Sequence, residues 1–248
     1  MRFTPRRVAI MAASIMMGWG TLSMATDKTP DALKNLTLAG EKVAVQQIEP
    51  APMNGIYRVV LQSGEAFYAD ASGRFLVVGD MYENTPQGLI NITERAQARE
   101  RIALLKNINV HDTIVYKPAG KVSAVITVFT DGTCAYCRKL HEELPALTKA
   151  GVEVHYMAFP RKGPESDSAR QLAQVLCSKQ PTEALSAVMR GDSLSNDGQR
   201  CQGRVTQQFE LGRQLGVRGT PAIFLEDGRL LSGYAPSERL LQQIGVKR

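Results

Sequence analysis

The chain has 248 residues, of which 44% are hydrophobic and 22% are charged, and its formal net charge at pH 7 is +6. This length suits one large domain or two modest ones. The positive charge is mild and forms no basic block, which excludes a protein built mainly to bind nucleic acid, so no nucleic-acid partner is expected.

The first 25 residues have the features of a cleavable signal peptide. Arg2, Arg6 and Arg7 give a positive start, residues 8–19 are mostly apolar, and residues 23–25 place small side chains at the two positions that signal peptidase reads. An uncleaved membrane anchor is disfavoured because the apolar run is too short to span a bilayer. Export to the periplasm would leave a formal charge near +3 and would put all four cysteines in an oxidising compartment.

Residues 26–90 are predicted to form a small domain rich in strands. Ile56–Leu61, Glu65–Tyr68 and Phe75–Val78 alternate in the manner of strands, and Asn-Gly and Ser-Gly pairs mark the turns. The segment holds no cysteine or histidine, so no catalytic group is visible. So small a sheet leaves an open edge, which pairing with a second chain would cover. A dimerisation domain is therefore predicted, and the alternative is a packing appendage without a partner.

Residues 91–112 are predicted to be a linker helix. Glu94 to about Lys106 has a helical pattern, with Thr93 as the expected N-cap. The apolar stripe, which includes Ala98, is narrow and is surrounded by charged side chains, and this suits an exposed connector. The alternative is that the segment is the first helix of the following domain.

Strands and helices alternate over residues 113–248, which predicts an α/β domain built on one sheet. Pro145 removes a backbone donor and should kink the first helix of this domain. The predicted order is a strand over Val122–Phe129, a helix over Cys134–Lys149, a strand over Val152–Phe159, a mostly helical stretch over residues 166–215, a hairpin over Ala222–Ser232 and a helix over Ser237–Ile244.

A Cys-Ala-Tyr-Cys motif at residues 134–137 lies between the first strand and the first helix. The apolar row that includes Leu140 extends back by one turn to Cys137, which is therefore predicted to be buried. Cys134 falls at the helix start, where free N–H groups and the helix dipole stabilise a thiolate. The motif therefore predicts a redox pair with an exposed, activated sulfur at Cys134 and a shielded one at Cys137.

Metal and haem sites with this spacing are less consistent with the sequence. A structural zinc site usually needs a second close cysteine pair, and Cys177 and Cys201 do not form one. Haem attachment needs histidine directly after the second cysteine, where this chain has Arg138. His141, one turn further on, is more typical of a surface or packing residue than of a ligand. Redox chemistry is favoured, and no metal and no cofactor are predicted.

A Gly-Thr-Pro sequence at residues 219–221 is the second signal, because it directly precedes the apolar run Ala222–Leu225. Proline is unusual at the start of a central strand, since it cannot donate to the ladder. A cis bond between Thr220 and Pro221 would turn the chain sharply and present backbone groups at a surface. A trans proline that opens an edge strand is the commoner alternative.

Several segments around these two motifs match one known family. They are Phe129-Thr130-Asp131, Thr133 to Cys137, Lys139 to Glu142, Ala158 to Arg161, Gln214 to Val217, Gly219 to Pro221 and Ile114 to Lys117, with Gln47 to Met53 and Gly79 to Tyr82 earlier in the chain. On these segments the chain resembles the DsbC/DsbG family of periplasmic disulfide isomerases, within the thioredoxin-like superfamily. The resemblance covers nearly all of the chain after the leader.

The resemblance implies a fold and an assembly. The fold is an α+β N-terminal dimerisation domain with a small antiparallel, cystatin-like sheet, joined by a linker helix to an α/β thioredoxin-like domain with a helical insertion. The implied assembly is a V-shaped homodimer with an apolar cleft. Alanine at position 135 departs from the glycine of DsbC, which leaves the redox potential open, and Thr133 stands where thioredoxin itself has tryptophan.

The resemblance also implies residue roles. Cys134 would attack mispaired disulfides and Cys137 would resolve the product, while Thr220 and a cis Pro221 would lie against the dithiol. Cys177 and Cys201 match a family pair that forms a structural disulfide, and two remaining cysteines in an exported chain are expected to pair.

The function predicted on this basis is isomerisation or reduction of non-native disulfides in misoxidised exported proteins, with chaperone activity. A DsbD-like membrane reductase would be the electron donor. The alternatives are a DsbG-like thiol reductase, a DsbA-like oxidase, which would not need the N-terminal domain, and a chaperone without enzymatic activity.

Overall fold

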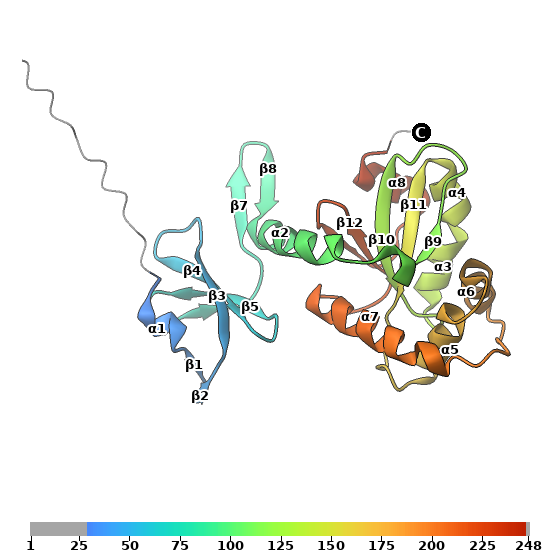
Figure 1. Ribbon diagram of the computed structural model, residues 1–248. Coiled ribbons are helices and arrows are strands. Elements are labelled where there is room, and N and C mark those ends of the chain that lie inside the picture. The colour runs from blue at the N-terminus through green and yellow to red at the C-terminus, as the bar shows by residue number, and fades with distance from the viewer. Residues whose placement is uncertain (1–28, 247–248) are drawn as a thin grey trace, which may run out of the picture. The chain divides into compact units, whose positions relative to one another are not determined.

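The computed structural model describes residues 29–246, and the predicted signal peptide lies outside them. The chain divides into two compact units at the Val77–Val78 bond (Figure 1). Each unit has a sheet and an apolar core of its own.

The first unit is built on a four-stranded antiparallel sheet in the order β3-β4-β5-β6. Its core is formed by side chains of this sheet and of the segment around the first helix, among them Leu33, Val59 and Phe67. Strand β3 was missed in the sequence because Pro50 and three polar residues interrupt its alternation. The elements are α1 (Asp31–Lys34), β1 (Thr37–Leu38), β2 (Glu41–Lys42), β3 (Val45–Pro50), β4 (Ile56–Leu61), β5 (Ala66–Asp70) and β6 (Leu76–Val77).

The second unit opens with a hairpin and a helix, β7 (Tyr82–Thr85), β8 (Gly88–Asn91) and α2 (Ile92–Lys106). The N-cap of α2 is Asn91, whose side chain accepts a hydrogen bond from the Glu94 amide at 2.9 Å. The expected cap at Thr93 was wrong, since the hydroxyl of Thr93 instead accepts the Met81 amide at 2.8 Å. Helix α2 is thereby joined to the hairpin that precedes it.

Most charged side chains of this helix are exposed, as expected, but Arg101 is only 6% exposed. Its guanidinium donates to the carbonyls of Leu215 and Gly228 and forms an ion pair with Glu94 at 2.7 Å. A charge can be buried when its donors are paired in this way. The backbone of Ala98 approaches Gly228 so closely that a Cβ there would lie 2.0 Å from the Ala98 oxygen. Helix α2 therefore packs directly on the remainder of the second unit.

A five-stranded sheet in the order β13-β12-β10-β11-β9 forms the centre of the second unit. Strands β10 and β11 are parallel and the other neighbours are antiparallel, which is the α/β arrangement that the strand–helix alternation predicts. The strands are β9 (Ile114–Tyr116), β10 (Ala124–Thr130), β11 (Val152–Ala158), β12 (Ala222–Leu225) and β13 (Leu230–Ser232).

The predicted first helix of this domain is two helices that meet at Glu143, α3 (Ala135–Glu142) and α4 (Leu144–Lys149). Pro145 lies in the first turn of α4, where its missing donor costs no hydrogen bond. The predicted helical stretch contains α5 (Asp167–Leu176), α6 (Pro181–Arg190), the 3-10 turn η2 (Gln199–Cys201) and α7 (Gln202–Gln214). The 3-10 turn η1 (Val110–Asp112) and the final helix α8 (Ser237–Ile244) lie elsewhere in the unit.

Two glycines of α7 give a matched stability test of the packing beneath this helix. A Cβ at Gly212 would lie 2.6 Å from the ring of Phe159, whereas a Cβ at Gly203 would meet nothing within 4 Å. We expect Gly212→Ala to lower the free energy of unfolding by about 1–3 kcal/mol, because of overpacking. Gly203→Ala should raise it by about 0.5–1 kcal/mol through helix propensity. Urea denaturation measures both, and equal shifts for the two variants would contradict this packing.

Candidate active site

The Cys-Ala-Tyr-Cys motif lies at the start of α3. Cys134 is the N-cap residue, with extended backbone angles, and its amide donates to the Asp131 carbonyl at 3.0 Å. Cys137 and Leu140 are the buried residues of this helix. The sequence pattern therefore placed Cys137 correctly on the inner face of α3, with Cys134 at the N-terminal end where a thiolate is favoured.

Cys134 is nevertheless buried, because only 3% of its surface is exposed, and Cys137 is 0% exposed. The prediction that the Cys134 sulfur is exposed was therefore wrong. The reason is the chain segment before β12, since the Cys134 thiol donates to the carbonyl of Thr220 at 3.3 Å. The Thr220–Pro221 peptide bond is cis. Strand β12 pairs with β10, and this pairing brings the Thr220 loop to the end of the strand that precedes the motif. Both cysteines are unpaired thiols.

The two thiols differ in acidity. Burial raises the pKa of Cys134, but hydrogen bonding by Thr220 and Cys137 and the positive charge of Arg161 outweigh it, so the pKa is lower than that of an ordinary thiol. Burial raises the pKa of Cys137 to about 11. At neutral pH Cys134 is therefore the thiol that ionises more readily, and Cys137 remains protonated until it reacts.

A buried carboxylate holds the turn before the motif. Asp131, which is 1% exposed, accepts the amide and hydroxyl of Thr133 and the amide of Arg161, and forms an ion pair with the Arg161 guanidinium at 3.3 Å. Arg161 lies 30 positions from Asp131, so no local pattern in the sequence indicates that the two residues are in contact. Asp131 fixes both the turn and the cation that lowers the pKa of Cys134.

The outer face of the motif carries aromatic side chains. Tyr136, between the cysteines, is 59% exposed and stacks on Tyr234 with ring centroids 6.3 Å apart. The Tyr234 hydroxyl donates to Glu143 at 2.9 Å, and Lys139 lies over the Tyr136 ring. An exposed aromatic surface beside a reactive thiol can bind apolar client side chains.

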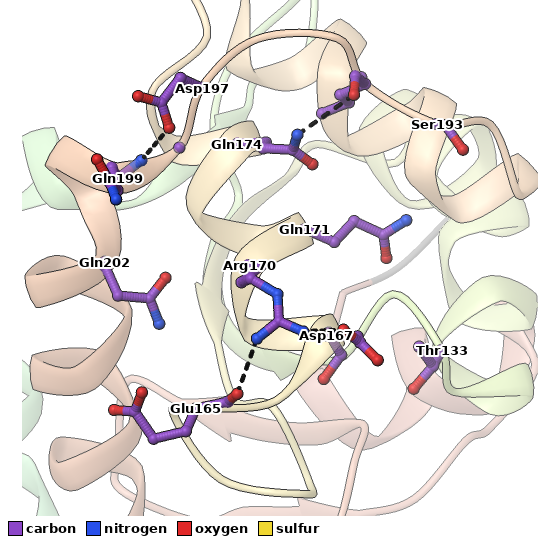
Figure 2. A pocket seen from close by; sticks show the side chains of 13 residues that line it. Thr133, Glu165, Asp167, Arg170, Gln171, Gln174, Ser193, Asp197, Gln199 and Gln202 are labelled. Carbon is purple, nitrogen blue, oxygen red and sulfur yellow. Dashed lines mark hydrogen bonds and ion pairs between the residues drawn. The ribbon is translucent and has the colours of Figure 1, made fainter.

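A polar pocket of about 760 Å³ adjoins the motif at Thr133 (Figure 2). Helix α5 supplies Gln171 and Gln174, and α7 supplies Gln202. Amide side chains offer both donors and acceptors, which suits contact with a polypeptide backbone. The remaining lining residues are Glu165, Asp167, Ser168, Arg170, Ser193, Leu194, Asp197, Gly198 and Gln199.

Cys177 and Cys201 form a disulfide with an S–S distance of 2.08 Å. It joins the C-terminal end of α5 to the 3-10 turn η2 that precedes α7. This bond lies within the helical insertion and is separate from the Cys134 and Cys137 thiols.

The acidity of His141 gives a prediction for acid stability. Burial and the charge of Arg190 lower its pKa from 6.5 to about 4. As pH falls from 6.5 to 4, His141 therefore becomes protonated in the unfolded chain but stays neutral in the folded chain. Because of this difference, the free energy of unfolding should fall by up to about 1 kcal/mol per pH unit over this range. His141→Gln should remove this part of the loss, which urea denaturation at the two pH values measures. An identical loss in the variant would contradict the prediction.

Within residues 29–246, no group of three or more His, Cys, Asp or Glu side chains is arranged to hold a metal ion. In the same part of the chain, no helix combines the length and the apolar composition needed to cross a bilayer.

Comparison with known proteins assigns the family. Residues 110–245 match the family described as a thioredoxin-like domain, and residues 23–94 match the disulfide bond isomerase protein N-terminal domain. The chain is 37% identical over 210 residues to the thiol:disulfide interchange protein DsbC of Escherichia coli (strain K12), covering 85% of each chain. This chain belongs to the DsbC family. The DsbC protein of Dickeya dadantii is 33% identical, with 89% of each chain covered.

A solved structure shares the fold over part of the chain. A linker-deletion mutant of Proteus mirabilis ScsC is similar with a TM-score of 0.52 and 22% identity, covering 62% of this chain and 83% of that chain. The predicted fold class, an N-terminal domain followed by a thioredoxin-like α/β domain with a helical insertion, is confirmed. DsbC membership also confirms the expected class of activity, thiol–disulfide interchange.

Proposed function

We propose that this protein is a periplasmic disulfide isomerase and reductase in which Cys134 is the nucleophile and Cys137 the resolving thiol. The observation that carries the proposal is the contact of the Cys134 thiol with the Thr220 carbonyl, next to a cis proline and at the start of α3. A sulfur of lowered pKa at this position is both a good nucleophile and a good leaving group.

The proposed reaction has two possible endings. The Cys134 thiolate attacks one sulfur of a non-native disulfide, a bond forms between Cys134 and the client, and the other client sulfur leaves as a thiolate. A different client thiolate then displaces Cys134, which completes an isomerisation. Alternatively, the Cys137 thiolate attacks Cys134, releases a reduced client and leaves the Cys134–Cys137 pair oxidised.

The high pKa of Cys137 favours the first ending. Because that thiol remains protonated at neutral pH, the mixed disulfide persists long enough for a client thiolate to compete with Cys137. The N-terminal domain favours an isomerase over a DsbA-like oxidase, which would not need that domain. The reactive dithiol favours an enzyme over a chaperone, which would not need the two thiols. A DsbG-like reductase would use the same residues and would differ in its clients.

The domain roles are part of the proposal: residues 26–90 dimerise, residues 91–112 link the two domains through a helix that packs on the second, and residues 113–248 catalyse. Strand β6 lies at an edge of its sheet, and Phe75 and Val77 beside and within it are 66% and 62% exposed. An apolar open edge of this kind is typically covered by a second chain. The occupant is a second copy of this chain, as DsbC-family membership supports.

Export and electron supply complete the proposal. Residues 1–25 act as the signal peptide that directs the protein to the periplasm. In that oxidising compartment the dithiol must be returned to its reduced state after each reductive ending. A DsbD-like membrane reductase supplies the electrons.

The test is to trap the mixed disulfide. In Cys137→Ala the resolving thiol is absent, so incubation with a scrambled, disulfide-bonded client should accumulate a covalent adduct that a non-reducing gel and mass measurement detect. The adduct should disappear on addition of dithiothreitol. Cys134→Ala is the matched control and should give no adduct. A non-covalent complex alone, equal in both variants, would favour the chaperone and overturn the proposal.

A further inference from the structure

Cys137 must become a thiolate before it can resolve the mixed disulfide, although its side chain is buried. The residue is 0% exposed, so bulk water does not solvate the charge, and burial raises the pKa of the thiol to about 11. A buried anion is stabilised only by donors that the protein itself supplies. The donors around this sulfur therefore influence how fast the resolving step occurs.

Thr130, the last residue of β10, lies on the side of the sheet that faces this sulfur. Its side chain shares one face of the strand with those of Ile126 and Val128, because side chains alternate along a strand. Ile126 and Val128 pack in the same apolar cluster as Cys137, whereas Phe129 packs in a different one. Burial raises the pKa of Cys137, and a hydrogen bond from the Thr130 side chain partly offsets this rise. The Thr130 hydroxyl is therefore a donor to the Cys137 sulfur.

The Thr130 hydroxyl is not used elsewhere in the fold. Thr130 is only 1% exposed, and within residues 29–246 its hydroxyl oxygen has no hydrogen-bond partner while Cys137 is a neutral thiol. The sulfur of a neutral thiol is a weak acceptor, whereas an ionised acceptor forms a much stronger hydrogen bond. The hydroxyl can therefore form a strong hydrogen bond only when Cys137 is charged, as expected of a group that stabilises a transient anion.

Two further donors act on the same sulfur. The Thr220 side chain and the Asp131 backbone also offset the rise that burial causes in the pKa of Cys137. The Thr220 hydroxyl is likewise buried without a partner in the described part of the chain. Burial also raises the pKa of Cys134, and there too the Thr220 side chain lowers it, whereas Thr130 lowers the pKa of Cys137 alone. Thr130 is therefore the side chain whose effect is specific to the resolving sulfur.

We propose that Thr130 is a catalytic residue of the resolving step, in which its hydroxyl donates a hydrogen bond to the Cys137 thiolate. This inference rests on the proposed function. Cys137 first gives its proton to water, and its thiolate then attacks Cys134. The Cys134–Cys137 bond forms, the Cys134–client bond breaks, and the client sulfur leaves with the bonding electrons. Thr130 keeps its proton throughout, and its hydrogen bond weakens as the charge moves to the client sulfur.

This hydrogen bond also influences which of the two endings the mixed disulfide takes. A client thiolate and the Cys137 thiolate compete for the same Cys134 sulfur. Stabilising the Cys137 thiolate favours release of a reduced client, and removing that stabilisation favours isomerisation. Thr130 therefore tunes the balance between reductase and isomerase activity.

The test follows resolution separately from attack. The reduced full-length protein is mixed with an excess of a small aromatic disulfide in a stopped-flow instrument, and release of the coloured thiol is recorded. The first equivalent reports attack by Cys134, and its rate rises with the disulfide concentration. The second equivalent reports resolution by Cys137, and its rate does not depend on that concentration.

Thr130→Val keeps the shape of the side chain and removes the hydroxyl. Loss of one hydrogen bond to a charged sulfur lowers its ionised fraction by about tenfold, and the less acidic thiolate regains about threefold in nucleophilicity. The second phase should therefore slow by about threefold at pH 7, and the first phase should be unchanged. The urea midpoint of this variant should not fall, because the hydroxyl that is removed is buried and unpaired.

Three variants serve as controls. Thr130→Ser restores the hydroxyl and should restore the second phase. Thr127→Val, in the same strand but on its opposite face, should leave both phases at the wild-type rate. Thr220→Val should slow both phases, because the Thr220 side chain lowers the pKa of both thiols. If Thr130→Val does not fold, Thr130→Ala, which also lacks the hydroxyl, decides the question.

The outcomes separate this inference from the proposed function. If the first phase is normal and Thr130→Val or Thr130→Ala resolves at the wild-type rate, the role of Thr130 is wrong and the proposed function stands. Equal slowing of both phases, or slowing that Thr130→Ser does not reverse, would also overturn the role of the hydroxyl. If the wild-type protein shows no first phase, the proposed function itself fails.

Discussion

Replacing Cys134 by alanine is expected to abolish disulfide exchange. Reduction of a small aromatic disulfide should fall by about three orders of magnitude or more, to the rate of the buffer, because the nucleophile itself is removed. In the wild-type protein the rate should reach its plateau at a lower pH than for an ordinary thiol, because the pKa of Cys134 is lowered. A spectrophotometric assay across pH measures both effects.

Cys137→Ala is the informative comparison for this experiment. It should retain the attack step and its pH profile, since the Cys137 pKa of about 11 keeps that thiol out of the first reaction. Equal loss of the attack step in the two variants would contradict the assignment of Cys134 as the attacking sulfur.

Removing the Cys177–Cys201 disulfide is expected to give the largest loss of stability. The bond closes a loop across 24 positions of sequence, which stabilises a fold by about 3.5 kcal/mol in the chain-entropy model. The double variant Cys177→Ala/Cys201→Ala should therefore unfold at a midpoint lower by about 10 °C. Thermal unfolding followed by circular dichroism measures the shift.

Dithiothreitol provides the control for this prediction. Because Cys134 and Cys137 are unpaired thiols, the reductant should lower the midpoint of the wild-type protein as far as the substitution does, and leave the double variant unchanged. A loss below about 1 kcal/mol in the double variant would contradict a structural role of the disulfide.

The parts of the fold that depend on local pattern could be predicted from the sequence. Strand β4 coincides with its predicted bounds, and Cys137 lies on the apolar face of α3 because helical spacing fixes that face. The break between α3 and α4 at Glu143 follows from Pro145, which fits only near a helix start.

The parts that depend on distant segments do not follow from local pattern, and only the family resemblance placed Thr220 and Pro221 against the dithiol. Cys134 is covered by the Thr220 carbonyl, 86 positions away, and no local feature of the motif shows that cover. Arg101 was expected among exposed charges, yet the carbonyls that pair with it come from Leu215 and Gly228. His141 is one of three histidines in the sequence, and nothing near it in the chain indicates that it contacts Tyr116 and Ser186 on other elements.

The measurement that tests the proposed function most directly is recovery of enzymatic activity from scrambled ribonuclease in glutathione buffer. The protein should restore activity faster than the buffer, Cys134→Ala should not, and Cys137→Ala should retain part of the effect, since isomerisation needs only the attacking sulfur. If the wild-type protein gave no recovery above the buffer while it rapidly oxidised reduced ribonuclease, the protein would be an oxidase. If Cys134→Ala restored activity as well as the wild type, the protein would be a chaperone.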